Sequence, residues 1–222
     1  MRALDLLLPL RCALCGRGER LLCGACLGAF VPVGPPLCAR CGTPTAWPVE
    51  RCAECAGRRI AFRTARSAVA YDETGRAFVR AWKERGLREL GRHAASRIAE
   101  IVPRPEAEAI TFVPGDRDRT RWRGHSTAES LARELAAAWD LPVVRALGRT
   151  GRTLRQRGLS RGARRANVRT AFRPLGTPPR RLLLVDDVYT TGATANAAAS
   201  ALRKAGVRSV DVVTFARALR DA

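Results

Sequence analysis

An apolar run that ends in two acids and a threonine-rich turn is the part of the sequence best suited to ligand chemistry. Residues 182–185 read Leu-Leu-Leu-Val, Asp186 and Asp187 follow, and residues 190–194 read Thr-Thr-Gly-Ala-Thr. Between a strand and a helix, such a turn lies at the carboxyl edge of a parallel sheet, where α/β proteins bind ligands. Gly192 lets the backbone approach an anion closely, and the amides that begin the helix favour phosphate. The turn is therefore predicted to bind a phosphate group.

The two acids suit a different part of the ligand from the threonines. Carboxylates repel a phosphate, but they accept hydrogen bonds from the vicinal hydroxyls of a ribose or hold a bridging Mg²⁺. The hydroxyl groups of Thr190, Thr191 and Thr194 are able to donate to the phosphate itself. The alternative is a turn that is rich in Asp and Thr by chance.

All eight cysteines precede residue 56, and they form four CxxC pairs: Cys12/Cys15, Cys23/Cys26, Cys38/Cys41 and Cys52/Cys55. One CxxC pair places two thiolates within reach of a tetrahedral ion, so four pairs predict two structural zinc sites. Iron–sulfur ligation, a redox pair and disulfides, which need an oxidising compartment, are the alternatives. Sequential sharing of the two ions needs only short loops, and an interleaved cross-brace stays open.

The charge of the chain indicates a polyanionic partner. Forty Lys and Arg residues oppose 20 Asp and Glu, which gives a formal net charge of +20. Codon bias explains arginine over lysine, but it does not explain a two-fold excess of positive charge. Nucleic acid is the expected partner, and a merely basic surface is the alternative. No apolar run approaches the roughly 20 residues of a membrane span, so a cytoplasmic protein is expected.

The periodicity of apolar residues predicts an α/β fold with a parallel, doubly wound sheet. Strands are expected at residues 65–71, 109–113, 143–147, 181–185 and 210–215, and helices at 78–82, 87–101, 126–139 and 194–206. Ser126 or Thr127 is placed to cap the third helix. The cysteines and the change in composition that follows them predict a zinc-ribbon domain at 1–60 and an α/β domain at 61–222.

Residues 184–194, Leu-Val-Asp-Asp-Val-Tyr-Thr-Thr-Gly-Ala-Thr, resemble the phosphoribosyl pyrophosphate (PRPP) signature of type I phosphoribosyltransferases. The resemblance implies a type I phosphoribosyltransferase-like sheet that binds PRPP together with Mg²⁺. It also implies that Asp186 and Asp187 contact the ribose hydroxyls in the catalytic site. The 5′-phosphate is then held by Thr190, Thr191, Gly192, Ala193 and Thr194.

Four CxxC pairs followed by this signature resemble the ComF competence family. Val113-Pro114 and the arginines after it fit that family, as do Tyr71, Lys83 and the basic stretch at 149–173, which holds nine arginines. The resemblance implies a role in DNA uptake and natural transformation, with single-stranded DNA and a helicase-like protein as partners. Pyrophosphate is expected near Arg119, Arg121 and Arg123, and tentative nucleic-acid contacts are expected at Arg149, Arg152, Arg155 and Arg165.

The chain departs from the family at one place and leaves two functions open. Where the family usually has Phe-Asn-Gln, this chain has His125-Ser126-Thr127. His125 is expected either to donate to the ligand or to lie in a solvent-exposed loop. One hypothesis is a PRPP-binding protein that handles DNA. The other is an active phosphoribosyltransferase of nucleotide metabolism or salvage without a DNA role.

Overall fold

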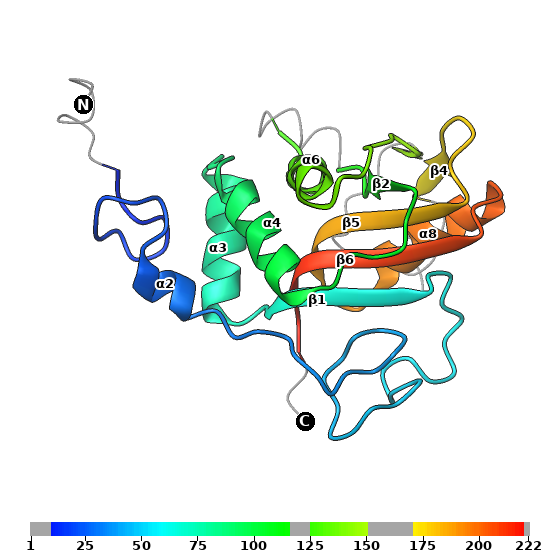
Figure 1. The fold of residues 1–222 in the computed structure, drawn as a ribbon, viewed down its shortest axis with the longest axis horizontal. Coiled ribbons are helices and arrows are strands. Elements are labelled where there is room, and N and C mark those ends of the chain that lie inside the picture. The colour runs from blue at the N-terminus through cyan, green and yellow to red at the C-terminus, as the bar shows by residue number, and fades with distance from the viewer. Residues whose placement is uncertain (1–9, 116–124, 151–170, 220–222) are drawn as a thin grey trace, which may run out of the picture.

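The structure is a computed structural model that describes residues 10–115, 125–150 and 171–219 of the chain. Within these residues, four parallel strands form the main sheet in the order β1-β6-β5-β2 (Figure 1). Their bounds are β1 Thr64–Ala70, β2 Ala109–Phe112, β5 Arg181–Tyr189 and β6 Ser209–Arg217. A separate antiparallel pair consists of β3 Leu147–Arg149 and β4 Phe172–Pro174.

Helices cover both faces of the sheet, as the doubly wound prediction requires. They are α3 Glu73–Glu84, α4 Leu90–Ile101, α6 Thr127–Trp139 and α8 Ala193–Lys204. One buried cluster joins α3, α4 and α6 to the first face, and a second cluster joins α8 and the β3–β4 pair to the other face. Residues 182–185 of β5 are at most 1% exposed, because a strand with both faces covered buries every side chain.

The boundaries of the elements correct the sequence-based expectations in three places. Strand β5 continues through both acids to Tyr189, because it stays paired with β6 as far as Arg217. The strand expected at 143–147 is wrong in extent: Val143 forms only an isolated bridge to Ile110, and β3 begins at Leu147. The first helix is also longer than 78–82 at both ends.

Side chains cap two of the helices at their N-termini. Asp72 precedes α3 and accepts a hydrogen bond from Gly75 N at 2.9 Å. Ser126 precedes α6, and its Oγ accepts from Glu129 N at 3.3 Å. The prediction of a cap at Ser126 or Thr127 is therefore confirmed for Ser126, which leaves the Thr127 hydroxyl free for another partner.

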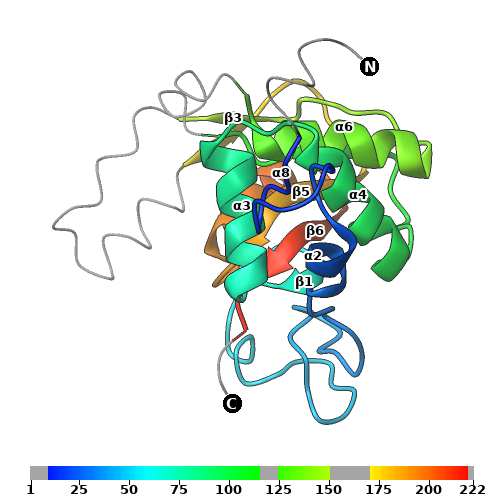
Figure 2. The same cartoon turned by 90° about the vertical axis from the view of Figure 1, so that its left-hand side faces the viewer.

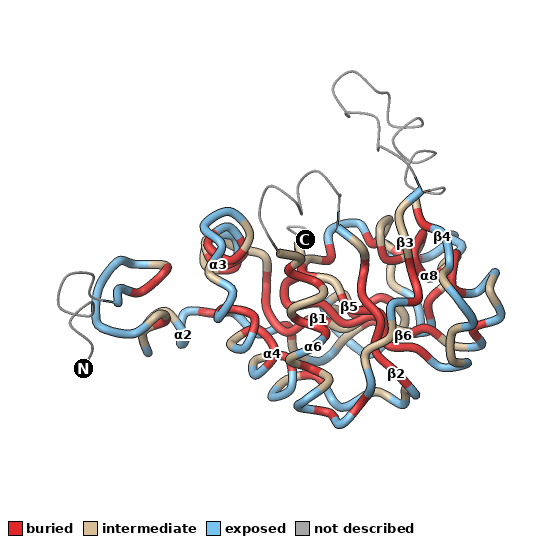
Figure 3. The backbone as a smooth tube through the Cα atoms, turned by 90° about the horizontal axis from the view of Figure 1, so that it is seen from above, coloured by how far each residue is buried: buried red, intermediate tan, exposed pale blue. Residues whose placement is uncertain are grey.

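The cysteine-rich segment consists of two ribbons that lie in different places. The first ribbon, residues 12–26, contains the beginning of the short helix α2 Gly24–Gly28 and lies beside α3 (Figure 1). It protrudes from the body, and many of its residues are exposed (Figure 3). The second ribbon, residues 38–55, lies along β1, where Ala65 N donates to Arg40 O at 3.0 Å.

Each ribbon is joined to the α/β part by its own contacts. Cys12, Ala13 and Leu22 of the first ribbon belong to the same buried cluster as α3 and α4, and Arg85 of the segment after α3 donates to Ala13 O at 2.7 Å. The division into domains at 1–60 and 61–222 stays a prediction. Over the described ranges, the helices are all too short or too polar to cross a membrane.

Candidate functional site

The predicted phosphate-binding turn lies at the carboxyl edge of the sheet, the edge that faces the viewer in Figure 2. We call residues 186–194 the ligand loop. A small cavity at this edge is lined mainly by the ligand loop, from which Asp186, Thr190, Gly192 and Thr194 contribute, together with Thr214 of β6. The structure thus brings together one acid, two threonines and the glycine that the sequence singled out. Thr190 and Thr191 are exposed, and Ala193 and Thr194 begin α8.

Asp187 faces away from this cavity, because adjacent side chains of a strand point to opposite faces. Its Oδ1 accepts from Lys83 Nζ of α3 at 2.6 Å, and its Oδ2 accepts from Thr127 Oγ1 of α6 at 2.6 Å. Both carboxylate oxygens are therefore occupied by groups of the protein. The hypothesis that Asp186 and Asp187 contact the ribose together is not tested by this arrangement, but the two acids have different environments.

Asp186 lines the cavity, and its charged form is disfavoured there. Its Oδ1 accepts from Asp187 N at 2.9 Å. Burial raises the pKa of Asp186 to about 8 from an ordinary value of 3.8, and the neighbouring charge of Asp187 adds to the shift. A group held neutral by its surroundings, next to a cavity, is a feature of ligand-binding and catalytic sites.

Gly192 meets two separate requirements at the turn. Its φ is +71°, in the left-handed region that side chains disfavour. A Cβ at this position would also overlap the hydroxyl group of Tyr189. No other residue type satisfies both constraints, so the local sequence Tyr189-Thr190-Thr191-Gly192 is specific for this turn.

His125 and its neighbours take structural roles that the departure from the family pattern had left open. His125 is half-buried, and its Nε2 lies 3.1 Å from Trp82 O. It is therefore not a fully solvent-exposed loop residue. Ser126 caps α6 and Thr127 contacts Asp187, so this part of the chain links α3 and α6 to the end of β5.

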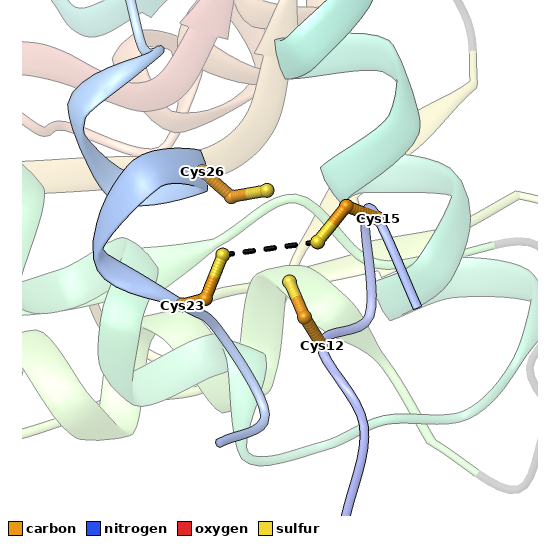
Figure 4. Close-up of side chains that lie close together, drawn as sticks. All are labelled: Cys12, Cys15, Cys23 and Cys26. Atoms are coloured by element: carbon orange, nitrogen blue, oxygen red, sulfur yellow. Dashed lines mark hydrogen bonds between the residues drawn. The ribbon is translucent and has the colours of Figure 1, made fainter. Parts of the chain in front are cut away.

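The eight cysteines form two clusters of four in sequential order, which excludes the interleaved cross-brace. Cys12, Cys15, Cys23 and Cys26 form the first (Figure 4), and Cys38, Cys41, Cys52 and Cys55 the second. In each cluster all the Sγ atoms lie within 4.8 Å of one another.

The spacing and chemistry of both clusters fit zinc. Tetrahedral coordination at about 2.3 Å places two sulfurs about 3.8 Å apart. The separation is 3.8 Å for Cys15 and Cys23, and 3.5 Å for Cys41 and Cys52. Each cluster therefore provides a closed, four-thiolate zinc site, which has a structural role because it leaves no position for a substrate.

The pKa values of the thiols in the second cluster are shifted in opposite directions, which favours binding of a cation. Burial acts to raise the pKa of Cys38, but backbone N–H groups of Cys41 and Cys52 outweigh it and lower the pKa to about 6. The pKa of Cys55 is raised to about 12, first by burial and then by its interactions with Cys38 and Cys41. One thiolate forms readily and disfavours the next, a conflict that a bound divalent cation removes.

Among the predicted arginines, only Arg149 lies within the described residues. It is half-buried at the end of β3, where its Nε donates to Pro114 O at 3.0 Å and its guanidinium lies 5.4 Å from the ring centre of Phe172. Phe172 packs in the core. The remaining predicted arginines lie outside the described residues: Arg119, Arg121, Arg123, Arg152, Arg155 and Arg165.

Several site residues were missed by the sequence reasoning. Thr127, Arg217, Arg58 and Asn196 all contact the ligand loop or its acids, Asn196 through its backbone N–H, which donates to Gly192 O. Three of them come from segments far from the loop in sequence, and no motif marks them as contacts of the loop. Asn196 alone carried a signal, since a polar residue in the first turn of α8 stands out in an otherwise alanine-rich helix.

Known proteins resemble this chain in its cysteine-rich segment and along most of its length. The family model of the double zinc ribbon domain matches residues 3–56. Competence protein F of Haemophilus influenzae is 40% identical over 116 residues, which are 50% of this chain and 51% of that protein. The DNA utilization protein YhgH of Salmonella typhimurium is 28% identical over 211 residues, 89% of this chain and 91% of that protein.

Two solved structures resemble the fold at low TM-scores. A glutamine PRPP amidotransferase from B. subtilis has a TM-score of 0.38 and 26% identity, covering 57% of this chain and 25% of that one. The orotate phosphoribosyltransferase of Aeropyrum pernix has a TM-score of 0.37 and 22% identity, covering 67% of each chain. With scores this low, the fold assignment depends on the strand order and the ligand loop.

The parallel sheet, the ligand loop and the two cysteine clusters define a double zinc ribbon protein with a phosphoribosyltransferase-like α/β domain. Its sequence relatives are competence protein F and the DNA utilization protein YhgH. These similarities agree with the resemblance of the chain to the ComF competence family. The chain spans about half the length of the H. influenzae relative in their match.

Proposed function

We propose that the ligand loop binds PRPP, or a related ribose 5-phosphate ligand, with Mg²⁺. The observation that carries this proposal is the cavity that gathers Asp186, Thr190, Gly192 and Thr194 at the carboxyl end of β5. The threonines and the first amides of α8 would hold the 5′-phosphate. Asp186 would accept hydrogen bonds from the ribose hydroxyls or hold Mg²⁺.

We further propose that Asp187 supports this site from behind. Lys83 and Thr127 already occupy its carboxylate, so its contribution would be to fix the end of β5 and the direction in which Asp186 points. The pyrophosphate would bind near Arg119, Arg121 and Arg123, a placement that is supported by the sequence resemblance alone. Positive charge at that position would stabilise pyrophosphate as it leaves.

The biological role proposed is DNA handling in the cytoplasm, in uptake or natural competence. Relatives carry the names competence protein F and DNA utilization protein. The net charge of +20 favours a polyanion. Single-stranded DNA is the expected partner, with tentative contacts at Arg149, Arg152, Arg155 and Arg165, and a helicase-like protein is a further partner.

Calorimetry of PRPP with Mg²⁺ against the zinc-loaded protein tests the ligand. Saturable binding to the native protein and at least a ten-fold weaker affinity in Asp186→Asn is the expected result. A conservative control is Asp140→Asn, at the exposed C-terminus of α6. Absence of binding in a folded, zinc-loaded protein would contradict the proposal.

An active phosphoribosyltransferase of nucleotide metabolism, without a DNA role, is the second candidate. The acid with the raised pKa at the cavity favours it, because such groups are common at catalytic sites. Release of pyrophosphate from PRPP in the presence of a nucleobase or amine distinguishes it. Turnover without any affinity for single-stranded DNA would favour this second function over the first.

A further inference from the structure

The second zinc ribbon is hydrogen-bonded to the end of strand β6 through a buried arginine. Arg217, the last residue of β6, is 1% exposed. Its Nη1 donates to Cys41 O at 2.6 Å, and its Nη2 donates to the Thr43 hydroxyl and to Glu54 Oε2, the latter at 3.2 Å. The partners of this buried charge therefore come from the ribbon, so its neutralisation depends on the ribbon being folded.

The same guanidinium contacts the ligand loop. It lies over the ring of Tyr189, 4.4 Å from the ring centre. Tyr189 is 4% exposed, and its hydroxyl fills the space that a side chain at Gly192 would need. A continuous row of contacts thus runs from Cys41, a zinc ligand, through Arg217 and Tyr189 to the turn at Gly192.

Residues just after the second ribbon make further contacts with the loop and with α8. Arg58 Nη2 donates to Thr191 O at 2.9 Å. Asn196, in the first turn of α8, accepts from Ala61 N at 2.7 Å and donates to Arg59 O at 3.1 Å. These hydrogen bonds hold the loop and the start of α8 against residues 58–61, which follow the second ribbon.

We propose that Arg217 and Arg58 are positioning residues of the ligand loop, through which the folded second ribbon holds the loop in its ligand-binding shape. The first ribbon is the natural contrast, because it packs on α3 and is tied there by Arg85. A ribbon of this size depends on its metal for folding. Loss of zinc from the second ribbon therefore loosens the loop, and loss from the first ribbon does so far less.

Hydrogen–deuterium exchange of the ligand-free protein tests the positioning directly. Arg58→Ala is the test variant, because Arg58 is exposed and its loss spares the core. Arg11→Ala is the matched control, since Arg11 is exposed and donates to a backbone carbonyl, Gly16 O, in the first ribbon. Exchange in a peptide spanning 189–196 is expected to be at least several-fold faster in Arg58→Ala than in Arg11→Ala, with β2 unchanged. Equal exchange in both variants overturns the proposal.

The role of each zinc is separated by one cysteine variant per ribbon. Cys52→Ser and Cys15→Ser are each expected to retain one zinc per chain instead of two, measured by native mass spectrometry. Only Cys52→Ser is expected to speed exchange at 189–196. Similar exchange in the two variants contradicts a specific link between the second ribbon and the loop.

Arg217→Lys keeps the positive charge but loses the two-pronged contact of the guanidinium with the ribbon. Its exchange at 189–196 should resemble that of Cys52→Ser, although it keeps two zinc ions. If circular dichroism finds Arg217→Lys unfolded, the Arg58 comparison decides.

The ligand part of this inference rests on the proposed function, and one further measurement keeps the two apart. Calorimetry with PRPP and Mg²⁺ is expected to give at least a five-fold weaker affinity for Arg58→Ala than for Arg11→Ala, at equal Tm. If no variant binds PRPP but the exchange differs as expected, the ligand is wrong and the positioning holds. If the native protein binds PRPP and Arg58→Ala matches it in affinity and exchange, the positioning is wrong.

Discussion

Lys83 Nζ lies 2.6 Å from Oδ1 of Asp187, and this ion pair joins α3 to the carboxyl end of β5. The side chains are 27% and 11% exposed, so the pair is largely shielded from water. Its consequence is an asymmetry between two adjacent acids. Asp187 is paired with Lys83 and accepts from Thr127, whereas Asp186 faces a cavity with its charge disfavoured. The two acids of one motif should therefore respond to mutation in opposite ways.

Asp187→Asn is expected to destabilise the protein. The substitution leaves Lys83 charged and largely buried without its partner, which costs about 1–3 kcal/mol after allowance for its partial exposure. Urea denaturation measures the loss as a lower midpoint at an unchanged slope. Lys83→Met in the Asp187→Asn background should recover part of the loss, because it removes the orphaned charge. A neutral effect of Asp187→Asn would contradict the structural role of the pair.

Asp186→Asn is expected to stabilise the ligand-free protein. The folded state holds the Asp186 proton up to a pH of about 8, whereas at the ordinary value of 3.8 the proton is lost near pH 4. Between these values the folded state binds more protons, so stability from this group is present at low pH and is lost as pH rises. The Asn variant avoids that loss, by about 1 kcal/mol or more at pH 8. Thermal unfolding from pH 5 to pH 9 measures the growing difference.

The affinity for PRPP should rise with pH if Asp186 must be ionised to take the ligand. Below its pKa of about 8, binding releases one proton, so affinity should rise up to about ten-fold per pH unit and level off above. Calorimetry in buffers of different ionisation enthalpy measures the proton release. Asp186→Asn provides the control for titration of the ligand's own phosphates. A pH profile that is the same in both proteins would mean that Asp186 is not the group involved.

Gly192→Ala should disrupt the ligand loop beyond the cost of its backbone conformation. Gly176 is the matched control, since its φ is +59° and a Cβ there meets nothing within 4 Å. Gly176→Ala is expected to cost about 1 kcal/mol from the positive φ alone. Gly192→Ala adds the overlap with Tyr189, so it should cost more and should also weaken ligand binding. Equal costs in chemical denaturation would show that the loop relaxes freely around Tyr189.

The two zinc ions should leave at different rates. Cys15 is exposed and Cys23 and Cys26 are half-buried in the first cluster, whereas Cys38, Cys41 and Cys55 of the second are at most 2% exposed. A chelator reaches the first site more easily, so zinc release followed with a chromogenic chelator should have two phases of about equal amplitude. Cys15→Ser should remove the fast phase. A single phase in the native protein would mean that the sites are equally accessible.

Much of the architecture could be predicted because it depends on local patterns. The four CxxC pairs predicted two tetrahedral thiolate sites, since two cysteines separated by two residues converge on one ion whatever the rest of the chain does. The apolar run before Asp186 predicted a buried parallel strand, and Ser126 predicted a helix cap. The strand expected at 143–147 was wrong, because pairing depends on a neighbouring strand and β2 accepts only a bridge at Val143.

The different environments of the two acids, and the contacts that hold the ligand loop, were decided by the tertiary structure alone. The sequence determined that two acids, a threonine-rich turn and two zinc ribbons exist in this chain. It did not determine that Lys83 forms an ion pair with Asp187 while Thr127 donates to it, or that Arg217 connects Cys41 to Tyr189. The pairs Thr127 and Asp187, Lys83 and Asp187, and Cys41 and Arg217 are 60, 104 and 176 residues apart. Such pairs carry no periodicity or spacing that marks them in a sequence. They meet only when the strands take their order and the second ribbon folds along β1.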